Sequence, residues 1–169
     1  MSTLTVLTYP DEFLSQSAKP VENIDGTIQN MIEDMSSTMY EAPGVGLAAI
    51  QVGFDQSIIV YDIAPRDENR SLHALINPKI ISSEGTTISE SEGCLSVPDF
   101  RSDVKRSASI LIEGFDRKEK PLRIEAHGHL AVVLQHEIDH LNGILFIDRI
   151  SSLKKGLYKR RIKKMLRQK

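Results

Sequence analysis

Two histidines separated by three residues carry the clearest chemical signal in the sequence. His136 and His140 enclose the stretch His-Glu-Ile-Asp-His. On a helix, residues four apart project from one face one turn apart, so both imidazole rings can share a metal ion at about 2.1 Å. Glu137 follows the first histidine, where a carboxylate can take a proton from a metal-bound water and pass it to a leaving group. The metal would lower the pKa of that water towards about 7 and polarise a carbonyl oxygen. The pattern indicates a metal-dependent amide hydrolase.

Two histidines do not complete a metal site, so a third ligand must come from elsewhere in the chain. The long metzincin pattern needs a histidine six residues after His140, where Phe146 stands, and no Glu or His follows His140. The third ligand is therefore expected upstream. The candidates are His73, His127, His129, several carboxylates and Cys94. A thiolate is the strongest candidate for a soft or borderline ion, and Cys94 lies in an expected glycine-bearing loop, residues 92–96, that can turn its side chain inward.

A second unusual stretch, residues 44–53, combines glycines with small apolar residues. The small residues allow a ligand or another backbone to approach closely, and Gln51 offers an amide donor in an apolar run. A phosphate-binding loop does not fit, because no Lys-Ser/Thr follows and the glycine spacing matches neither nucleotide fingerprint. The stretch either approaches a ligand or forms a tight turn into a small-residue core segment.

The helices that position these residues can be traced from apolar periodicity. A short helical turn is expected within residues 11–18. A long helix is expected after the capping residues 25–27 and should end at Pro43-Gly44, with an apolar face of Ile28, Met31, Ile32, Met35 and Met39. A second long helix should run from near Gly128 through the histidine pair to Asn142-Gly143, with an apolar stripe of Leu130, Val133, Leu134, Ile138 and Leu141. The C-terminal segment predicts a third helix.

The remaining apolar runs predict strands. These are residues 57–63, 72–76 and 79–81, followed by a hairpin of residues 107–115 and 121–126 around the charged turn 116–120. Strands in runs with helices apart from them predict an α+β fold. We expect antiparallel β-sheets packed around a buried metal-binding helix, with a C-terminal helix.

Length and composition agree with one globular unit. The chain has 169 residues, 40% of them hydrophobic and 26% charged, so it can bury a real core. Without repeats or low-complexity linkers, residues 1–169 are expected to form a single catalytic domain. No apolar run approaches the about 20 residues of a membrane helix, and the first 25 residues resemble neither a signal nor a transit peptide. We expect a soluble, cytoplasmic protein without membrane contact. Its single cysteine excludes an internal disulfide.

The charge distribution is uneven. Residues 151–169 hold nine Lys/Arg and no acidic residue, whereas residues 1–150 have a net charge of −11. A compact acidic body with a basic tail indicates an anionic partner for that tail, or a solvated helix that favours solubility.

Three stretches together resemble the motifs of the peptide deformylases. Residues 44–51 are similar to GxGLAAxQ, residues 92–96 to EGCLS, and residues 136–140 to HExDH within QHExDHLxG. They occur in the family's order with the spacing of its bacterial members, and the resemblance covers essentially the whole chain. It implies removal of the formyl group from N-formylmethionyl nascent polypeptides, with release of formate.

The resemblance also implies a role for each motif residue. Glu137 would be the general base and then the acid that protonates the departing amine. The Gln51 side chain and the Leu95 backbone N–H would stabilise the oxyanion of the tetrahedral intermediate. A single divalent metal, with water in its open fourth position, would be bound by Cys94, His136 and His140.

Further residues are implied in substrate binding. Gly46 would pair through its backbone with the substrate chain as an added strand. Arg101 matches a family arginine near the peptide backbone of the substrate. The methionine pocket would be lined by Val45, Val132, Val133 and part of His136.

Four positions near the motifs remain open. Glu92 or Asp139 is expected to accept the second N–H of a ligand histidine. Pro43 stands where some bacterial relatives carry a glutamate, and Glu90 stands where an apolar pocket residue can occur. These two departures concern the edge of the specificity pocket.

The metal and the partners follow from different arguments. Cys-His-His coordination alone favours Zn²⁺. The resemblance instead implies Fe²⁺ as the native ion, with Zn²⁺, Ni²⁺ or Co²⁺ in purified protein. It also implies a ribosome contact through the basic C-terminal helix, and we expect a monomer.

Two other functions compete with this reading. An RNA- or ribosome-binding module could use the metal only structurally, but such a site would prefer four protein ligands. A general zinc endopeptidase would share the helix motif, but Cys94 as ligand and the absence of a downstream glutamate argue against it.

Overall fold

The computed structural model describes residues 2–64 and 69–168, whose strands form two antiparallel sheets. The larger sheet has the strand order β1-β2-β3-β6-β7, and the smaller is the hairpin β4-β5. The strands are β1 (Gly46–Ala48), β2 (Ile58–Tyr61), β3 (His73–Glu84), β4 (Thr87–Cys94), β5 (Val97–Arg106), β6 (Ser109–Phe115) and β7 (Pro121–His127). The helices are α1 (Gly26–Glu41), α2 (Gly128–Leu141) and α3 (Ser152–Arg167), with 3-10 turns η1 (Glu12–Ser15), η2 (Ala49–Val52) and η3 (Phe146–Arg149). The predicted α+β fold is confirmed.

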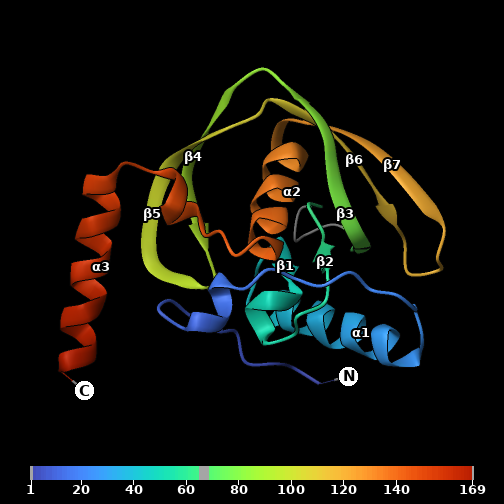
Figure 1. Ribbon diagram of the computed structural model, residues 1–169, viewed down its shortest axis with the longest axis horizontal. Helices are drawn as coiled ribbons and strands as arrows, with labels where there is room; N and C mark the ends of the chain where they lie inside the picture. Colours follow the sequence, from blue (N-terminus) through green and yellow to red (C-terminus); the bar gives the residue numbers. More distant parts are fainter. Residues whose placement is uncertain (1, 65–68, 169) are drawn as a thin grey trace.

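Helix α2 occupies the centre of the molecule. Figure 1 shows β3, β6 and β7 on one side of it and the β4-β5 hairpin on the other, with α1 across the base. Helix α3 lies at the outer edge, beyond β5 (Figure 1). The helix that carries the histidine pair is therefore enclosed by both sheets, as predicted.

The first long helix forms where its periodicity predicts it. The Asp25 side chain accepts a hydrogen bond from the backbone N–H of Ile28 at 3.1 Å, which satisfies one free donor of the first turn. The predicted apolar face is buried in one core cluster, which contains Ile28, Met31, Ile32, Met35 and Met39. This cluster supports β1 and β2 from below, so it holds the strand that borders the site.

Helix α2 also has the predicted limits. Its apolar stripe is buried except at Leu130, which is half-buried. The chain leaves the helix through Asn142 and Gly143, and Gly143 adopts a φ of +73°. A Cβ atom there would lie 2.4 Å from the carbonyl oxygen of Ser15, so the left-handed turn and the close approach both require glycine.

The prediction of two strands at residues 72–76 and 79–81 was wrong, because one strand, β3, spans His73–Glu84. Asn77 interrupts its register without ending it. This residue has a φ of +52°, its Oδ1 accepts a hydrogen bond from Val21 N–H at 2.8 Å, and its Nδ2 donates to Val21 O at 2.9 Å. These two bonds hold a bulge in place, so the strand continues beyond the proline.

The prediction of a loop at residues 92–96 was wrong for residues 92–94, which belong to β4, and right only for the turn at Leu95 and Ser96. Cys94 is the last residue of β4 and pairs with Val97, the first residue of β5, so only two residues form the turn. The polar composition of β4 concealed the strand, since much of it is exposed. Cys94 is thus fixed at a strand end instead of lying in a loop.

The predicted β6-β7 hairpin and C-terminal helix are confirmed. Helix α3 begins after Ser151, whose side chain caps Lys154 N–H. It is anchored by Tyr158 and Ile162, which pack with Phe146 in a core cluster below β5. Lys169 lies outside the described residues. No helix within the described ranges is long and apolar enough to cross a bilayer.

Candidate metal centre

The end of β4 and the centre of α2 bring three potential ligand atoms together. His140 Nε2 lies 3.3 Å from Cys94 Sγ and 3.2 Å from His136 Nε2. All three ligand atoms lie within 4.8 Å of one another. Neighbouring ligands of one tetrahedral ion are separated by about 3.3–3.6 Å when metal–ligand bonds are about 2.0–2.3 Å. The geometry therefore fits a single metal ion. The place between the three ligand atoms is called the metal point below.

Among the described residues, one upstream side chain completes the group of metal ligands. Cys94 is the only upstream candidate that joins the histidine pair in such a group. His73 stacks on Tyr61 on a different strand pair, with ring centroids 5.1 Å apart. His127 and His129 lie at the start of α2, before the pair. Spacing along the sequence could not decide which of these candidates is the third ligand.

The orientation of the His136 ring supports metal binding. Its Nδ1 lies 2.7 Å from Glu92 Oε1, so Nδ1 carries a proton donated to that carboxylate. A metal ion would replace the proton on Nε2, whose lone pair would then be directed towards His140 and Cys94. A cysteine sulfur and two imidazole nitrogens that lie around one point form the donor set preferred by a borderline divalent ion. The residues present therefore fit the metal.

Glu137 lies beside this point, almost wholly buried. Its Oε1 is 3.8 Å from His136 Nε2 and 3.9 Å from His140 Nε2. Burial raises the pKa of Glu137 to about 7, while the positive charge of His136 opposes the shift. A carboxylate with this pKa can both accept and release a proton near neutral pH. Its position and its pKa suit proton transfer.

Gly46 lies against Glu137 at the free edge of the larger sheet. The carbonyl of Val45 accepts a hydrogen bond from Asp62 N–H at 2.9 Å, so Val45 faces β2. Because peptide groups alternate along a strand, Gly46 presents its own to the open edge. An extended peptide can pair with this edge as an additional strand.

Gln51 is held rigidly next to Cys94. Its Oε1 accepts a hydrogen bond from Ala48 N–H at 2.9 Å, and its Nε2 donates to Ser96 Oγ at 3.0 Å. The same Nε2 lies 3.6 Å from Cys94 Sγ. Leu95 follows the cysteine in the hairpin turn. The side-chain amide of Gln51 and the turn at Leu95 thus lie next to Cys94, beside the metal point.

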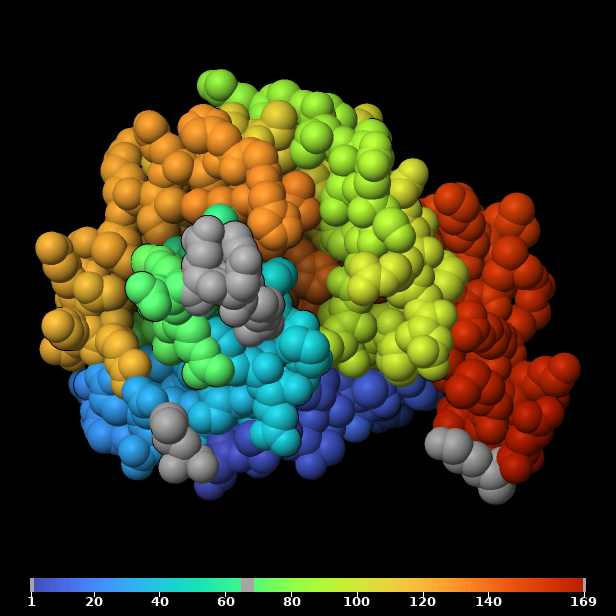
Figure 2. Space-filling model, turned by 180° about the vertical axis from the view of Figure 1, so that it is seen from behind, coloured from blue at the N-terminus to red at the C-terminus, as the bar shows by residue number. Residues whose placement is uncertain are grey.

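These residues share one cleft with a volume of about 1210 Å³. Figure 2 shows it as a hollow between the cyan segment around β1, the orange α2 and the yellow-green β4-β5 hairpin. All the predicted site residues line it except His140, which is fully buried: Val45, Gly46, Gln51, Cys94, Leu95, Arg101, Val132, Val133, His136 and Glu137. Residues from five separate elements, β1, η2, β4, β5 and α2, therefore meet at one opening.

The rim of the cleft combines apolar and charged groups. Val45 is 41% exposed there. Arg101 donates a hydrogen bond to Ser91 O at 3.1 Å and covers Gly93, where a Cβ would lie 3.1 Å from the guanidinium carbon. Pro43 and Glu90 also line the opening. The two departures from the family pattern therefore lie at its edge, away from the metal point.

A buried ion network behind the metal point was missed from the sequence. The Arg106 guanidinium donates to Glu92 through Nε, at 3.2 Å from Oε2, and through Nη2 to Oε1. Its Nη1 donates to Asp139 Oδ2 at 2.7 Å. Arg149 donates to the same Asp139 through Nε at 2.5 Å and Nη2 at 2.7 Å. Glu92 is thus the residue that contacts a ligand histidine, and Asp139 is buried behind it.

Electrostatics within this network keep Glu92 ionised. Burial alone would raise its pKa, but hydrogen bonds from His136 and Arg106 lower the pKa of Glu92 to about 2. The alternation of β5 contains a signal for Arg106, because Ser102, Val104 and Arg106 share its inward face. That signal can be used only when β5 is known to be a strand, and the polar composition of this segment does not predict one.

Sequence comparisons identify proteins similar to this chain. The sequence model of the polypeptide deformylase family matches residues 3–156. The peptide deformylase of Desulfosudis oleivorans is 49% identical over 168 residues, which cover 99% of this chain and 97% of that protein. The peptide deformylase of Syntrophobacter fumaroxidans is 51% identical over 168 residues, covering 99% and 98%.

Solved structures give the same result. A peptide deformylase from Legionella pneumophila has a TM-score of 0.90 at 43% identity, covering 98% of this chain and 96% of that one. The peptide deformylase of Ehrlichia chaffeensis in complex with actinonin has a TM-score of 0.90 at 36% identity, covering 98% of both chains. The similarity thus extends over almost the whole fold.

Proposed function

This chain belongs to the polypeptide deformylase family and removes the formyl group from the N-terminal N-formylmethionine of nascent polypeptides as formate, and we propose that Glu137 moves the protons of this reaction beside one metal ion held by Cys94, His136 and His140. The observation that carries this proposal is the convergence of the three ligand atoms within 4.8 Å, next to a buried carboxylate.

Glu137 acts first as a base and then as an acid. The oxygen of the attacking water forms a bond to the formyl carbon, and Glu137 accepts the proton that this water loses. When the carbon–nitrogen bond breaks, Glu137 delivers the proton to the departing amine nitrogen, so that formate and a free methionine amine leave. The buried position of Glu137, which raises its pKa to about 7 in the metal-free chain, supports a carboxyl group that takes up and releases a proton in turn.

Gln51 and Leu95 stabilise the negative charge that develops on the formyl oxygen. The Gln51 amide is held by its bonds to Ala48 and Ser96, so its Nε2 needs little reorganisation to donate to the oxyanion. The Leu95 N–H is the second donor. Both follow from their positions beside Cys94 in the cleft.

The substrate chain lies along the open edge of β1. Gly46 pairs with its backbone, and Arg101 contacts the peptide farther along the cleft. The methionine side chain occupies an apolar pocket formed by Val45, Val132 and Val133, with part of His136. A flexible thioether suits such a pocket, since it packs well against branched aliphatic side chains.

Family members use a single metal ion, and the identity proposed for this chain is Fe²⁺. When bound, the ion acts as a Lewis acid that polarises the formyl carbonyl and lowers the pKa of the attacking water. The Cys-His-His donor set also accepts Zn²⁺, Ni²⁺ or Co²⁺, which are the ions expected in purified protein.

The chain acts as a single catalytic domain over residues 1–169, as a monomer in the cytoplasm, where nascent chains carry their formyl groups. Its basic C-terminal helix, residues 151–169, contacts the ribosome. The charge of this helix supports the contact, because α3 presents most of its basic residues to solvent.

One assay separates this function from a general zinc endopeptidase and from a module with a structural metal. Formate release is measured from formyl-Met-Ala-Ser, and internal cleavage is measured on a longer unformylated peptide. Deformylation with no internal cleavage is the expected result. Internal cleavage would favour the endopeptidase, and inactivity of the metal-loaded protein on both would favour the structural role.

A further inference from the structure

The buried network behind the metal point connects the elements that carry the ligands. Glu92 belongs to β4, Arg106 to β5, Asp139 to α2 and Arg149 to η3. Each carboxylate accepts hydrogen bonds from Arg106, and Asp139 also accepts two from Arg149. The β4-β5 hairpin and the α2-η3 segment, which are distant in sequence, are therefore joined by the side chains of four residues.

This connection matters because the ligands come from two separate layers. Cys94 ends β4, which forms a sheet with β5 alone. His136 and His140 belong to α2, which lies outside that hairpin. The position of the thiol relative to the histidines therefore depends on side-chain contacts between hairpin and helix, and Arg106 makes ionic contacts with both.

The burial of these charges makes the arrangement specific. Glu92, Arg106 and Asp139 are 8%, 5% and 7% exposed. A buried charge that loses its partner is strongly destabilising, so each of the three is stable only in the presence of the others. A guanidinium can donate to two carboxylates at fixed angles, which an ammonium cannot reproduce. The network therefore admits one relative position of hairpin and helix.

The far end of the network is more accessible. The Arg149 side chain is 43% exposed and lines a second cavity, of about 320 Å³, together with Arg106 and Asp139. Its guanidinium group donates hydrogen bonds to both carboxylate oxygens of Asp139. Arg149 thus restrains the carboxylate that Arg106 uses, without contacting a metal ligand or the substrate cleft.

We propose that Arg106 and Arg149 are positioning residues that hold the β4-β5 hairpin against α2, so that Cys94 meets the histidine pair before any metal binds. Arg106 acts through Glu92 on the His136 ring, and Arg149 acts through Asp139 on Arg106. The inference rests on the proposed ligand set but is independent of the formyl substrate.

The test measures metal retention instead of turnover. Protein loaded with Zn²⁺ is mixed with excess chelator, and the rate of metal release is followed for the wild type and for Arg106→Lys and Arg149→Gln. The control is Arg117→Gln, which removes a similar ionic contact, with Glu33, on the opposite side of the fold. Losing a group that orients a metal ligand typically weakens metal binding about 10–100-fold.

We expect release to be about 10–100-fold faster in Arg106→Lys, and faster by a smaller factor in Arg149→Gln, with no change in Arg117→Gln. Turnover of the reloaded variants should show a lower kcat with an unchanged KM, because neither arginine lines the cleft. If Arg106→Lys does not fold, Arg149→Gln and Asp139→Asn carry the test. Release at the wild-type rate in every folded variant would overturn the proposal, whether or not the wild type deformylates.

Discussion

Gly46 and Glu137 lie so close together that the side chain of any other residue at position 46 would collide with Glu137. A Cβ atom on residue 46 would lie 2.9 Å from Cγ and 3.1 Å from Oε2 of Glu137. The bare backbone of β1 thus lets the carboxylate reach the metal point while the same backbone faces the cleft. With the roles proposed above, this glycine both makes room for the proton-transfer group and pairs with the substrate.

Gly46→Ala should therefore lower kcat. The methyl group must displace the Glu137 side chain, and a misplacement of about 1 Å can cost about 100-fold in rate. Formate release measures the effect. Gly156→Ala is the matched control, because a Cβ there meets no atom within 4 Å and its activity should be unchanged. Wild-type kcat in Gly46→Ala would show that the contact has no role in catalysis.

The identity of the metal can be tested by exposure to air. An Fe²⁺ enzyme should lose activity in air, because oxygen converts Fe²⁺ to Fe³⁺ or oxidises the Cys94 ligand. Protein prepared without oxygen should contain about one iron per chain, and Ni²⁺-substituted protein treated identically should keep its activity. Equal activity of aerobic and anaerobic iron preparations would count against Fe²⁺.

Much of the fold could be predicted from periodicity. The apolar faces of α1 and α2 follow the helical repeat, and the caps at Asp25 and Gly143 mark their limits. The β4-β5 hairpin could not be found in this way, because its exposed polar residues have the composition of a loop. The alternation of buried and exposed residues along β5 arises because α2 and η3 cover one face of the hairpin, and both elements are distant from it in sequence.

The site was predicted unevenly for a similar reason. His136 and His140 are neighbours on one helix, so spacing alone places them together. The proximity of Cys94 depends on how the hairpin docks on α2, which no local pattern encodes. Arg106 was missed for the same reason, since an arginine in a polar segment usually lies on the surface.

Tyr158 gives a prediction on alkaline stability. Burial raises the pKa of Tyr158 to about 12, and its hydroxyl has no hydrogen-bond partner within the described residues. The folded pKa exceeds the unfolded value of about 10, so the folded state holds this proton more tightly. Ionisation of Tyr158 therefore does not affect stability below pH 10 and lowers stability as the pH rises from 10 towards 12.

Tyr158→Phe should remove this dependence. Above pH 10 the free energy of unfolding should fall less steeply in the variant than in the wild type, as measured by urea denaturation. At pH 7 the variant should be at least as stable, because it no longer buries an unpaired hydroxyl. Tyr40→Phe, which removes a bond to Asp62, should instead cost about 1 kcal/mol. Equal alkaline slopes in wild type and Tyr158→Phe would refute the assignment.

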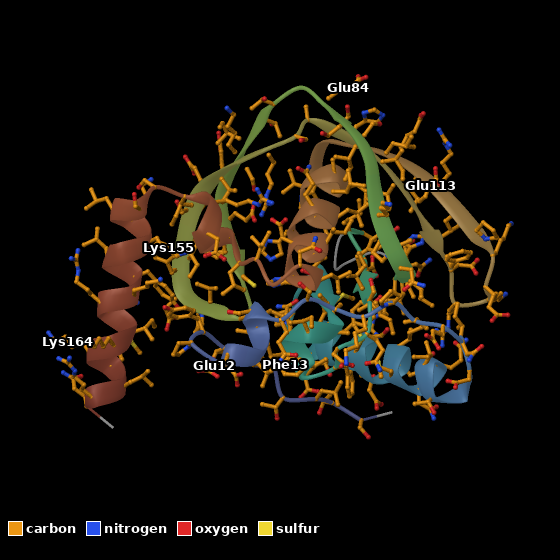
Figure 3. The ribbon with its side chains drawn as sticks, viewed as in Figure 1. Glu12, Phe13, Glu84, Glu113, Lys155 and Lys164 are labelled. Atoms are coloured by element: carbon orange, nitrogen blue, oxygen red, sulfur yellow. The ribbon has the colours of Figure 1, made fainter. Side chains whose placement is uncertain are left out.

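The C-terminal helix gives a prediction on ribosome binding. In Figure 3, Lys164 points away from the body, whereas Lys155 points towards η3, where it pairs with Asp148. Replacing the exposed Arg160, Lys163 and Lys164 by glutamine should weaken co-sedimentation with ribosomes at low salt. The slope of log affinity against log salt should fall by about 2, because three phosphate contacts are lost.

Substitution is preferable to deletion of the helix, since deletion would also expose the core around Tyr158 and Ile162. The control replaces three exposed lysines on other elements, Lys79, Lys118 and Lys120, and should leave binding unchanged. If the α3 variant sediments like the wild type, the proposed ribosome contact through this helix is wrong.

The most direct test of the catalytic assignment is Glu137→Gln. The amide has nearly the same shape but cannot accept the proton of the attacking water. Formate release from formyl-Met-Ala-Ser is measured on wild type and variant, each with its metal content determined on the same sample. We predict a kcat about 100- to 10,000-fold lower with about one metal ion still bound per chain. Retention of wild-type kcat in the metal-loaded variant would contradict the account.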